Sequence, residues 1–307
     1  MSKNFKIALI AAGVAVAGMI LAAVGFAWSG GDVGSERFEF FEKSFPAKKI
    51  DRISTSLGSD DVHLSVTDGD EITLSYYDNG RGYYEVSLDG GELKIKRNVV
   101  RGRWYENIRV GFGETCGRVE IGLPEKYSGE LELHAGSGDI ELDGVSTIEA
   151  LSVAAGSGSV SLENVSCLGD ISVSTSSGEL RADGLEARSF RAESSSGDVE
   201  LADVSCQNEM EIKASSGDIT LDGCTADEYR LRASSGDISV ADGDFESAEL
   251  ETTSGDITAR FRGGMEDYSI RSGTTSGDNT LPERLDGGDR RLDVTTTSGD
   301  ISVYFDR

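Results

Sequence analysis

Apolar and polar residues alternate along most of the chain after residue 130, and the alternation itself recurs about every 20 residues. A period of two is typical of β-strands, whose side chains point to opposite faces in turn. Each recurrence contains the string S-x-G-D-I or a close variant. The nine copies centre on Gly138, Gly158, Gly178, Gly197, Gly217, Gly236, Gly255, Gly277 and Gly299.

The apolar positions keep fixed distances from these glycines. Residues five before, two after and four after the glycine are mostly apolar, and the residue three before it is small. The column five before consists of Leu133, Val153, Val173, Ala192, Ile212, Leu231, Leu250, Ser272 and Val294. The column two after consists of Ile140, Val160, Leu180, Val199, Ile219, Ile238, Ile257, Asn279 and Ile301. We expect these columns, with the one four after, to point into the core.

Two short strands per repeat, joined at S-x-G-D and at a second turn such as LDGV, make one coil of about 20 residues. One coil cannot bury its inner face, so coils must stack by parallel strand pairing, at about 4.8 Å per layer. The sequence therefore predicts an all-β fold, a parallel β-solenoid stacked coil by coil. We expect the corner glycine to supply a positive φ, and the Ser and Asp side chains to bond the corner backbone.

One column on the outer surface carries charges of both signs. Glu193, Lys213, Arg232 and Glu251 lie four residues before successive glycines. Stacked coils would place Glu193 beside Lys213 and Arg232 beside Glu251, each pair contributing at most a few tenths of a kcal/mol. This column is therefore predicted to face outward.

The N-terminal part of the chain is apolar instead of alternating. Residues 7–28 carry no charge, and 22 helical residues would span about 33 Å, enough for a bilayer core of about 30 Å. A basic stub, residues 1–6, precedes this segment, so the positive-inside rule predicts a cytoplasmic N-terminus and an extracellular remainder. We expect one uncleaved transmembrane signal-anchor. A cleaved signal peptide is the alternative, although its apolar region is usually shorter.

Residues 29–37 are predicted to form a flexible stalk, and residues 38–129 a divergent β capping region before the solenoid of residues 130–307. The stretch LGSDDVHLSV at residues 57–66 is similar to a divergent first copy of the coil. Aromatic residues concentrate in the capping region, and a carbohydrate-stacking surface is the alternative interpretation there. These aromatics include Tyr76, Tyr77, Tyr83, Tyr84, Trp104 and Tyr105.

The chain has a formal charge of −26, and Lys3 and Lys6 are its only charged residues before Asp32. The remainder carries 27 Lys and Arg against 55 Asp and Glu. Such a surface would gather counterions instead of releasing them, so nucleic acid is excluded as a partner.

The order of LPEKYSGELELHAGSGDIEL, then recurring SSGDI, behind an N-terminal apolar segment resembles the bacterial putative-adhesin family. The resemblance covers residues 38 to 307. It implies a β-strand-repeat domain on the cell envelope of unknown function, often encoded near envelope-stress genes. The family has no established catalytic residues to carry over.

The corner acids could form a column of carboxylates about one layer apart. Hard cations take several oxygen ligands, so Ca²⁺ could bridge Asp198, Asp218, Asp237 and Asp256. The competing interpretation is an Asp that bonds backbone N–H groups and is screened by solvent, and we favour it. We therefore expect no cofactor and no metal, with this column as the one candidate cation edge.

Catalytic chemistry finds little support in the sequence. His63 and His134 are the only histidines, and no large loop interrupts the coils to form a cleft. Cys116, Cys167 and Cys206 show no metal-binding spacing, and Cys224 aligns with Val165 and Val204 as a buried thiol. Cys167 and Cys206 occupy matching positions two coils apart, about 9.6 Å, which is too far for a disulfide. A bond between Cys206 and Cys224 stays open.

These observations favour a non-enzymatic surface protein of the cell envelope, an adhesin or scaffold that presents a rigid acidic solenoid. Its partner would be cell-wall glycan, matrix or a membrane protein. One alternative is the ectodomain of an envelope-stress sensing or regulatory membrane complex. The second is a polysaccharide-active β-helix enzyme, which the uniform coils disfavour.

Overall fold

The computed structural model describes residues 39–78, 83–98 and 117–306, and strands dominate them. Helical structure in this part is limited to two 3-10 turns, η1 (Ala47–Lys49) and η2 (Met265–Asp267). The strands form two large sheets, called sheet A and sheet B below, and one small sheet.

Sheet A contains 12 strands among the described residues. In spatial order they are β1 (Glu39–Pro46), β4 (Glu71–Asp78), β7 (Arg118–Pro124), β3 (Asp61–Thr67), β9 (Ile140–Asp143), β11 (Val160–Glu163), β13 (Leu180–Asp183), β16 (Val199–Ala202), β19 (Ile219–Asp222), β21 (Ile238–Gly243), β23 (Ile257–Arg262) and β27 (Ile301–Asp306).

Sheet B contains 13 strands in the same described segments. From the other end of the stack they are β25 (Arg284–Leu285), β24 (Tyr268–Ser276), β26 (Arg290–Ser298), β22 (Ser247–Thr252), β20 (Glu228–Ala233), β18 (Glu209–Ala214), β15 (Ser189–Ser194), β12 (Asp170–Thr175), β10 (Ala150–Ala155), β8 (Glu130–Ala135), β2 (Arg52–Ser56), β6 (Glu92–Arg97) and β5 (Tyr84–Asp89).

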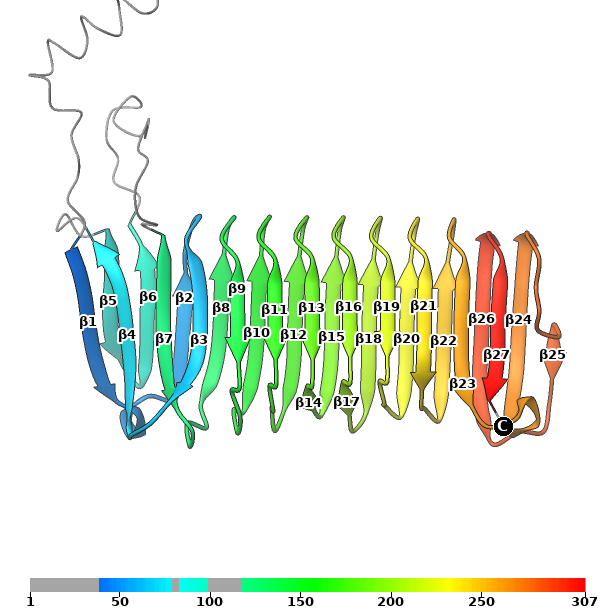
Figure 1. Ribbon diagram of the computed structural model, residues 1–307, viewed down its shortest axis with the longest axis horizontal. Helices are drawn as coiled ribbons and strands as arrows, with labels where there is room; N and C mark the ends of the chain where they lie inside the picture. Colours follow the sequence, from blue (N-terminus) through cyan, green and yellow to red (C-terminus); the bar gives the residue numbers. More distant parts are fainter. Residues whose placement is uncertain (1–38, 79–82, 99–116, 307) are drawn as a thin grey trace, which may run out of the picture. The chain divides into compact units, whose positions relative to one another are not determined.

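The repeats stack as a parallel solenoid, which confirms the predicted fold. Each repeat places one strand in sheet B, turns at the S-x-G-D corner, and places the next strand in sheet A (Figure 1). We call such a pair of strands a layer. Equivalent residues of neighbouring repeats are direct partners, as Ile212 with Leu231 and Ile219 with Ile238. The backbone N–H and C=O groups on both edges of a strand need hydrogen-bond partners, and the strands of the neighbouring layers provide them.

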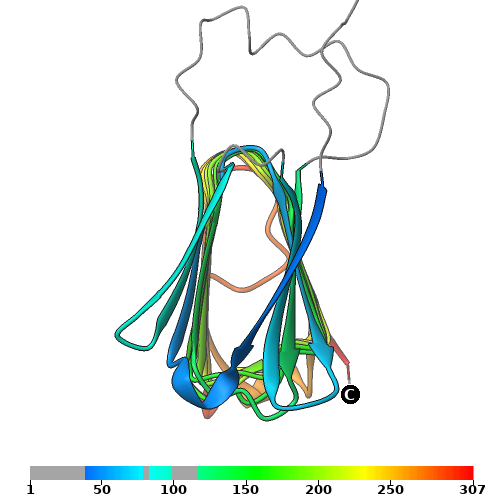
Figure 2. The same ribbon diagram turned by 90° about the vertical axis from the view of Figure 1, so that its left-hand side faces the viewer.

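The predicted core columns are confirmed. Leu231 and Ile238, five before and two after the corner glycine, are both fully buried. The column four residues after the glycine is also buried, from Leu142 at 1% exposure to Val303 at 5%. Figure 2 looks along the stack and shows the two sheets facing each other across this interior. Val145, Val165, Leu185, Val204 and Cys224 fill the core beside the second turn.

The second turn is more regular than expected, because it adds a short third side to the coils between Ile148 and Asp244. β14 (Glu186–Ala187) pairs in parallel with β17 (Ser205–Cys206). Isolated bridges extend this pairing, as from Ser205 to Thr225 and from Thr225 to Asp244. Two residues per layer are too few to show as alternation in the sequence.

The stack does not follow chain order at its C-terminal end, and this part of the prediction is wrong. β26 of the ninth repeat lies between β22 of the seventh and β24 of the eighth. The reason lies in two polar core positions of the eighth repeat, Ser272 and Asn279. In the terminal layer the Asn279 amide donates to the Ser272 hydroxyl at 2.9 Å, and that hydroxyl donates to the Pro282 carbonyl at 2.9 Å. Chain-order stacking would have placed both side chains between two apolar layers.

The predicted first copy at residues 57–66 is part of a true layer. β2 and β3 pair in parallel with β8 and β9 of the first regular repeat. β6 and β7 form a further layer outside them. Beyond it, β4, β1 and β5 add antiparallel strands, so residues 39–78, 83–98 and 117–124 share one continuous core with the repeats.

Aromatic side chains close both ends of this core. At the N-terminal end, Phe41 stacks on Tyr76, which contacts Tyr84 edge-on with ring centroids 5.0 Å apart. At the other end, Phe261 and Phe305 pack around Tyr268, with 5.0 Å between the rings of Tyr268 and Phe305. Terminal layers lack a neighbour on one side, and large rings cover part of the interior there.

The predicted signal-anchor of residues 7–28 and the stalk of residues 29–37 lie outside the described residues. Within the described ranges, no helix is long and apolar enough to cross a bilayer.

Candidate binding surfaces

The corner glycine is required by close packing, and the prediction that it supplies a positive φ is wrong for every corner except Gly277, whose φ is 148°. A Cβ on Gly217 would lie 2.0 Å from the carbonyl oxygen of Gly197 in the layer below. The same clash recurs along the column, at 2.0 Å or less for Gly158, Gly178, Gly236 and Gly255 as well. Only glycine lets neighbouring corners approach at the layer spacing.

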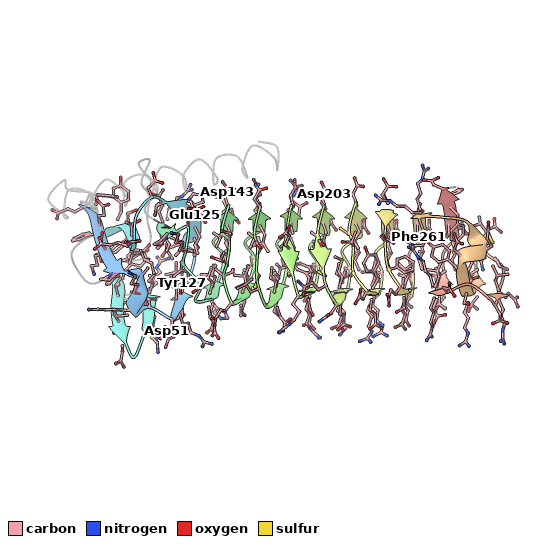
Figure 3. All side chains as sticks on the ribbon, turned by 90° about the horizontal axis from the view of Figure 1, so that it is seen from below. Asp51, Glu125, Tyr127, Asp143, Asp203 and Phe261 are labelled. Carbon is pink, nitrogen blue, oxygen red and sulfur yellow. The ribbon has the colours of Figure 1, made fainter. Side chains whose placement is uncertain are left out.

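Positive φ angles occur at the second turn instead. They run from 50° to 68° in the column Gly144, Asn164, Gly184, Asp203, Gly223 and Asp242. Gly, Asn and Asp are the residues that adopt this conformation most readily. Figure 3, seen from the second-turn side, shows Asp143 and Asp203 along the edge where sheet A strands end.

The four predicted candidate acids do come together in one exposed column. Each carboxylate accepts a hydrogen bond from the backbone N–H of the corner residue in the next layer. Asp198 accepts from the N–H of Asp218 at 2.9 Å. Asp218 accepts from Asp237, and Asp237 from Asp256, both at 2.8 Å. Asp256 accepts from Asp300 at 2.8 Å, in agreement with the inserted ninth repeat.

The column is therefore a ladder of hydrogen bonds between layers. The prediction was that these bonds would lie within each corner. One oxygen of each carboxylate is occupied by a backbone donor. Among residues 39–78, 83–98 and 117–306, no group of three or more His, Cys, Asp or Glu side chains is placed to hold a metal ion. Calcium binding at Asp198, Asp218, Asp237 and Asp256 stays a prediction that the structure does not test.

The outer face of sheet B carries a lattice of ion pairs. Arg232 bonds Glu251 of the next strand at 3.1 Å, as predicted, and also Glu249 at 3.0 Å. Glu193 and Lys213 are direct register partners, as predicted, but they do not form the ion pair expected of them. Lys213 bonds Glu211 on its own strand at 2.5 Å.

Glu193 bonds Arg191 on its own strand at 2.7 Å. Same-strand partners two residues apart point to the same face, and the prediction considered only partners between strands. Glu211 is the least exposed acid of the lattice, at 13%, and it also pairs with Arg191. The hydrogen bond from Lys213, and then the charge of Arg191, hold the pKa of Glu211 below its ordinary value.

A shallow groove of about 610 Å³ runs along sheet B beside the S-x-G-D corners. It crosses the layers from Ala155 to Thr253, because the small residues three before each glycine draw the surface inward. Its lining combines charged outward side chains with a column of hydroxyls. These residues are Glu193, Lys213, Arg232 and Glu251, with Ser176, Ser195, Ser215, Ser234 and Thr253.

The aromatics predicted in the capping region divide into two groups. Tyr76, Tyr83 and Tyr84 are buried at 4–6% exposure, as the capping interpretation expects. Tyr77 is 42% exposed and meets Phe40 of β1 edge-on, with 5.4 Å between ring centroids. Trp104 and Tyr105 lie outside the described residues.

A buried ion pair in the cap was not predicted. Asp60 is 1% exposed and accepts a bond from Arg97 at 2.8 Å, and the Arg97 guanidinium lies 4.4 Å from the centre of the Tyr83 ring. Asp60 takes the position of the corner glycine in the first copy, since a Cβ on Gly138 would meet its carbonyl oxygen at 2.1 Å. Burial raises the pKa of Tyr84 beside it, so that phenol stays protonated. The sequence signal for this ion pair was Asp60 in GSDD, where the later copies have the corner glycine.

The cysteines show no sign of chemistry in the described residues. Cys167, Cys206 and Cys224 are buried and free, so the disulfide left open between the last two is not formed. Burial raises the pKa of Cys206 to about 12 and that of Cys224 to about 11, which keeps both as unreactive thiols. Cys116 lies outside the described residues.

His134 lies on the outer face, as predicted, with Nε2 3.2 Å from a Glu132 carboxylate oxygen. His63 is half-buried on β3. It is the direct register partner of Glu141 on β9, so both side chains face the same side of sheet A. The two histidines are therefore on different sheets, and they do not form one site.

Residues 50–209 and 168–307 each match the profile of the family described as Toastrack DUF4097. No curated protein matches the chain. The fold is similar to that of a putative lipid binding protein from Parabacteroides distasonis, at 16% identity and a TM-score of 0.52, over 88% of this chain and 97% of that chain.

Two further solved structures are similar at lower scores. A putative adhesin from Parabacteroides distasonis is 14% identical over 87% of this chain and 97% of its own, with a TM-score of 0.45. A putative adhesin from Bacteroides fragilis is 11% identical over the same shares, with a TM-score of 0.44. At these identities the likeness concerns the fold alone. The two profile matches together cover most of the chain, and the chain belongs to the Toastrack DUF4097 family.

Proposed function

We propose that the chain is a non-enzymatic protein of the cell envelope, held in the membrane by residues 7–28 with its solenoid outside the cell. It acts there as an adhesin or scaffold. The observation that carries this proposal is the groove on sheet B, which repeats the same side-chain positions in each layer at about 4.8 Å. A surface with this periodicity suits an extended partner that meets equivalent groups many times.

The chemistry of the groove favours hydrogen bonding over catalysis. Its charged side chains lie on strands of sheet B and its hydroxyls in the adjoining corner turns, and the charged groups Lys213, Arg232 and Glu251 are already engaged in ion pairs. A partner would therefore gain many weak polar contacts spread along the stack. Cell-wall glycan fits this requirement best, and matrix or a membrane protein are the other partners we consider.

A binding assay tests the proposal. The full chain, incorporated in vesicles, is mixed with purified cell-wall polymer, and co-sedimentation is measured. Ser215→Trp with Ser234→Trp fills the groove and should abolish binding. Ser152→Trp is the matched control, because Ser152 is exposed on β10 of the same sheet but outside the groove. Binding that both variants retain would contradict the groove as the binding surface.

Crosslinking in native membranes tests the alternative that the solenoid belongs to a stress-sensing complex. This alternative requires a second membrane protein as the partner of the solenoid. Capture of one specific membrane protein, lost in the groove-filling variant, would favour the regulatory role over the adhesin role.

A further inference from the structure

We infer that the N-terminal end of the solenoid stands on the lipid bilayer, with Phe40, Tyr77 and Leu88 in contact with the membrane interface. This inference rests on the proposed anchor at residues 7–28. It adds an orientation and a second membrane contact, in which folded residues rest on the lipid surface.

Exposed apolar side chains gather at this end of the stack. Six large hydrophobic side chains are exposed in the described residues, and Phe40, Tyr77 and Leu88 are 56%, 42% and 41% exposed. β1 and β5 are the outermost strands of sheets A and B, and they carry Phe40 and Leu88. Tyr77 follows on β4, in ring contact with Phe40. Phe40 and Tyr77 point away from the core on sheet A, and Leu88 lies on the inner side of β5. Exposed apolar side chains of both sheets therefore lie at this end of the stack, and such exposure marks a contact surface.

The interior is also incompletely covered at this end. Leu88 lies in register with Leu93, a fully buried residue of β6, so it belongs to the inward-facing side of its strand. Phe41, Phe45 and Val86 pack on the core but stay half-buried, because no further layer of the described strands covers them. Figure 2 has this end toward the viewer and shows β5 diverging from the strands opposite. The terminal layer thus presents an apolar surface across both sheets.

The chain outside the folded part decides which partner covers this surface. Only ten residues separate Trp28, the last residue of the predicted anchor, from Glu39, the first residue of β1. Fully extended, they span at most about 40 Å, so the anchor must enter the bilayer close to this end. Phe and Tyr side chains are favoured at the membrane interface, where a ring and a polar edge are both accommodated.

The charge of β1 and η1 permits this contact although the chain as a whole is strongly acidic and β5 carries Glu85 and Asp89. Residues 39–49, which form β1 and η1, carry two acids and three lysines. Lys48 and Lys49 end this stretch on η1, and both are exposed. They can therefore approach phosphate groups, while acidic repulsion keeps the remaining layers away from the membrane. The stack axis would then be perpendicular to the bilayer, because β1 and β5 run across that axis at the end of the stack.

The opposite end supplies a matched control. Tyr304 on β27, the last strand of sheet A, is 54% exposed, close to the value for Phe40. It lies on the same sheet at the far end of the stack. Reporter groups at positions 40 and 304 therefore have nearly the same solvent exposure but lie at opposite ends of the stack.

The test uses the full chain in phosphatidylcholine vesicles, with Trp28 and Trp104 replaced by Phe and a single tryptophan introduced as F40W, K48W or Y304W. Quenching by brominated phosphatidylcholine is measured on the vesicle-bound fraction. We expect strong quenching and a blue-shifted emission for F40W and K48W, and neither for Y304W. A variant of K48W that carries Phe40→Ser, Tyr77→Ser and Leu88→Ser should stay vesicle-bound and lose the quenching.

Three results would overturn the inference. Vesicle-bound F40W that is no more quenched than Y304W would refute the membrane contact and leave the anchor intact. Quenching of K48W that survives the three serine substitutions would show that the tether alone holds this end near lipid. A chain that does not associate with vesicles at all would refute the proposed anchor together with the contact.

Discussion

The side chain of Asp218 accepts a hydrogen bond from the backbone N–H of Asp237 at 2.8 Å, so a carboxylate of one layer binds the backbone of the next. Because Asp237 binds Asp256 in the same way, the corner acids from Asp198 to Asp300 form an unbroken ladder through successive layers. The acidity of the corners is therefore partly structural. Like charges one layer apart are tolerated where each has a backbone donor and water around it.

Removing one rung should lower stability, and the loss should depend on the acceptor and not on the charge. Asp218→Ala leaves the Asp237 N–H without its partner and should cost about 0.5–1.5 kcal/mol. Asp218→Asn keeps an acceptor oxygen and should cost clearly less. Urea unfolding of both variants measures the difference, and equal stability of the two would contradict the ladder.

The same column allows a test of calcium. If the carboxylates serve only the ladder, millimolar Ca²⁺ should raise the melting temperature no more than NaCl of equal ionic strength. A cation edge would instead add about 2.7 kcal/mol per site at a hundredfold excess over Kd. That gain would have to disappear when Asp218, Asp237 and Asp256 are all replaced by Asn.

Gly217→Ala should be among the most damaging single substitutions in the solenoid. The new methyl group would meet the Gly197 carbonyl oxygen at 2.0 Å, which forces two layers apart. Overpacking of this kind costs about 1–3 kcal/mol or more. Gly273→Ala is the control, because no atom lies within 4 Å of the added methyl and its φ is not in the left-handed region. Equal melting temperatures for the two variants would argue against close packing at the corners.

The parallel solenoid, the buried columns and the outward charged column follow from the sequence alone, because each is a periodic property. The features that were mispredicted depend on a neighbour that periodicity does not identify. Gly217 looks like a turn glycine until the layer below it is placed, and Glu193 has two possible cations within reach. Asp60 and Arg97 are far apart in the sequence, and only the cap brings them together.

The order of the last layers is an intermediate case, since the signal was present. Ser272 and Asn279 interrupt two otherwise apolar columns in one repeat. A repeat with polar core positions is stable only where one of its faces is not covered by a further apolar layer. The sequence contained this information, but a strict repeat with constant spacing favours stacking in chain order.

A pair of disulfide crosslinks tests that order. Glu251 is the direct partner of Thr295, which in turn is the partner of Gly273. Cysteines at 251 and 295 should crosslink on oxidation, because adjacent layers lie about 4.8 Å apart and a disulfide allows about 7 Å between Cα atoms. Cysteines at 251 and 273 are two layers apart and should not. Peptide mapping by mass spectrometry reads out both, and the reverse result would restore chain-order stacking.

The lattice on sheet B should make stability depend on pH through Glu211. Its pKa is lowered in the folded state, first by the Lys213 hydrogen bond and then by Arg191. The stabilisation is therefore complete above the unfolded pKa of about 4.3 and is lost as the pH falls through the folded value. Glu211→Gln should cost about 1–2 kcal/mol at neutral pH, since it weakens bonds to two charged groups.

The difference between wild type and Glu211→Gln should shrink progressively below about pH 4, where the wild-type carboxyl becomes neutral as well. Denaturant unfolding at a series of pH values measures this. A difference that stays constant through the acid range would mean that packing, and not the charge of Glu211, stabilises this part of the sheet.

The mass of the mature protein tests the central claim, that this is an envelope protein held in the membrane by its own N-terminal segment. The chain is extracted from a native membrane fraction, and its intact mass and N-terminal peptides are determined. The account predicts that residues 7–28 are still attached and that the protein leaves the membrane only with detergent. Recovery of a protein that begins near Trp28 or Ser29 would contradict it, because the chain would then be secreted.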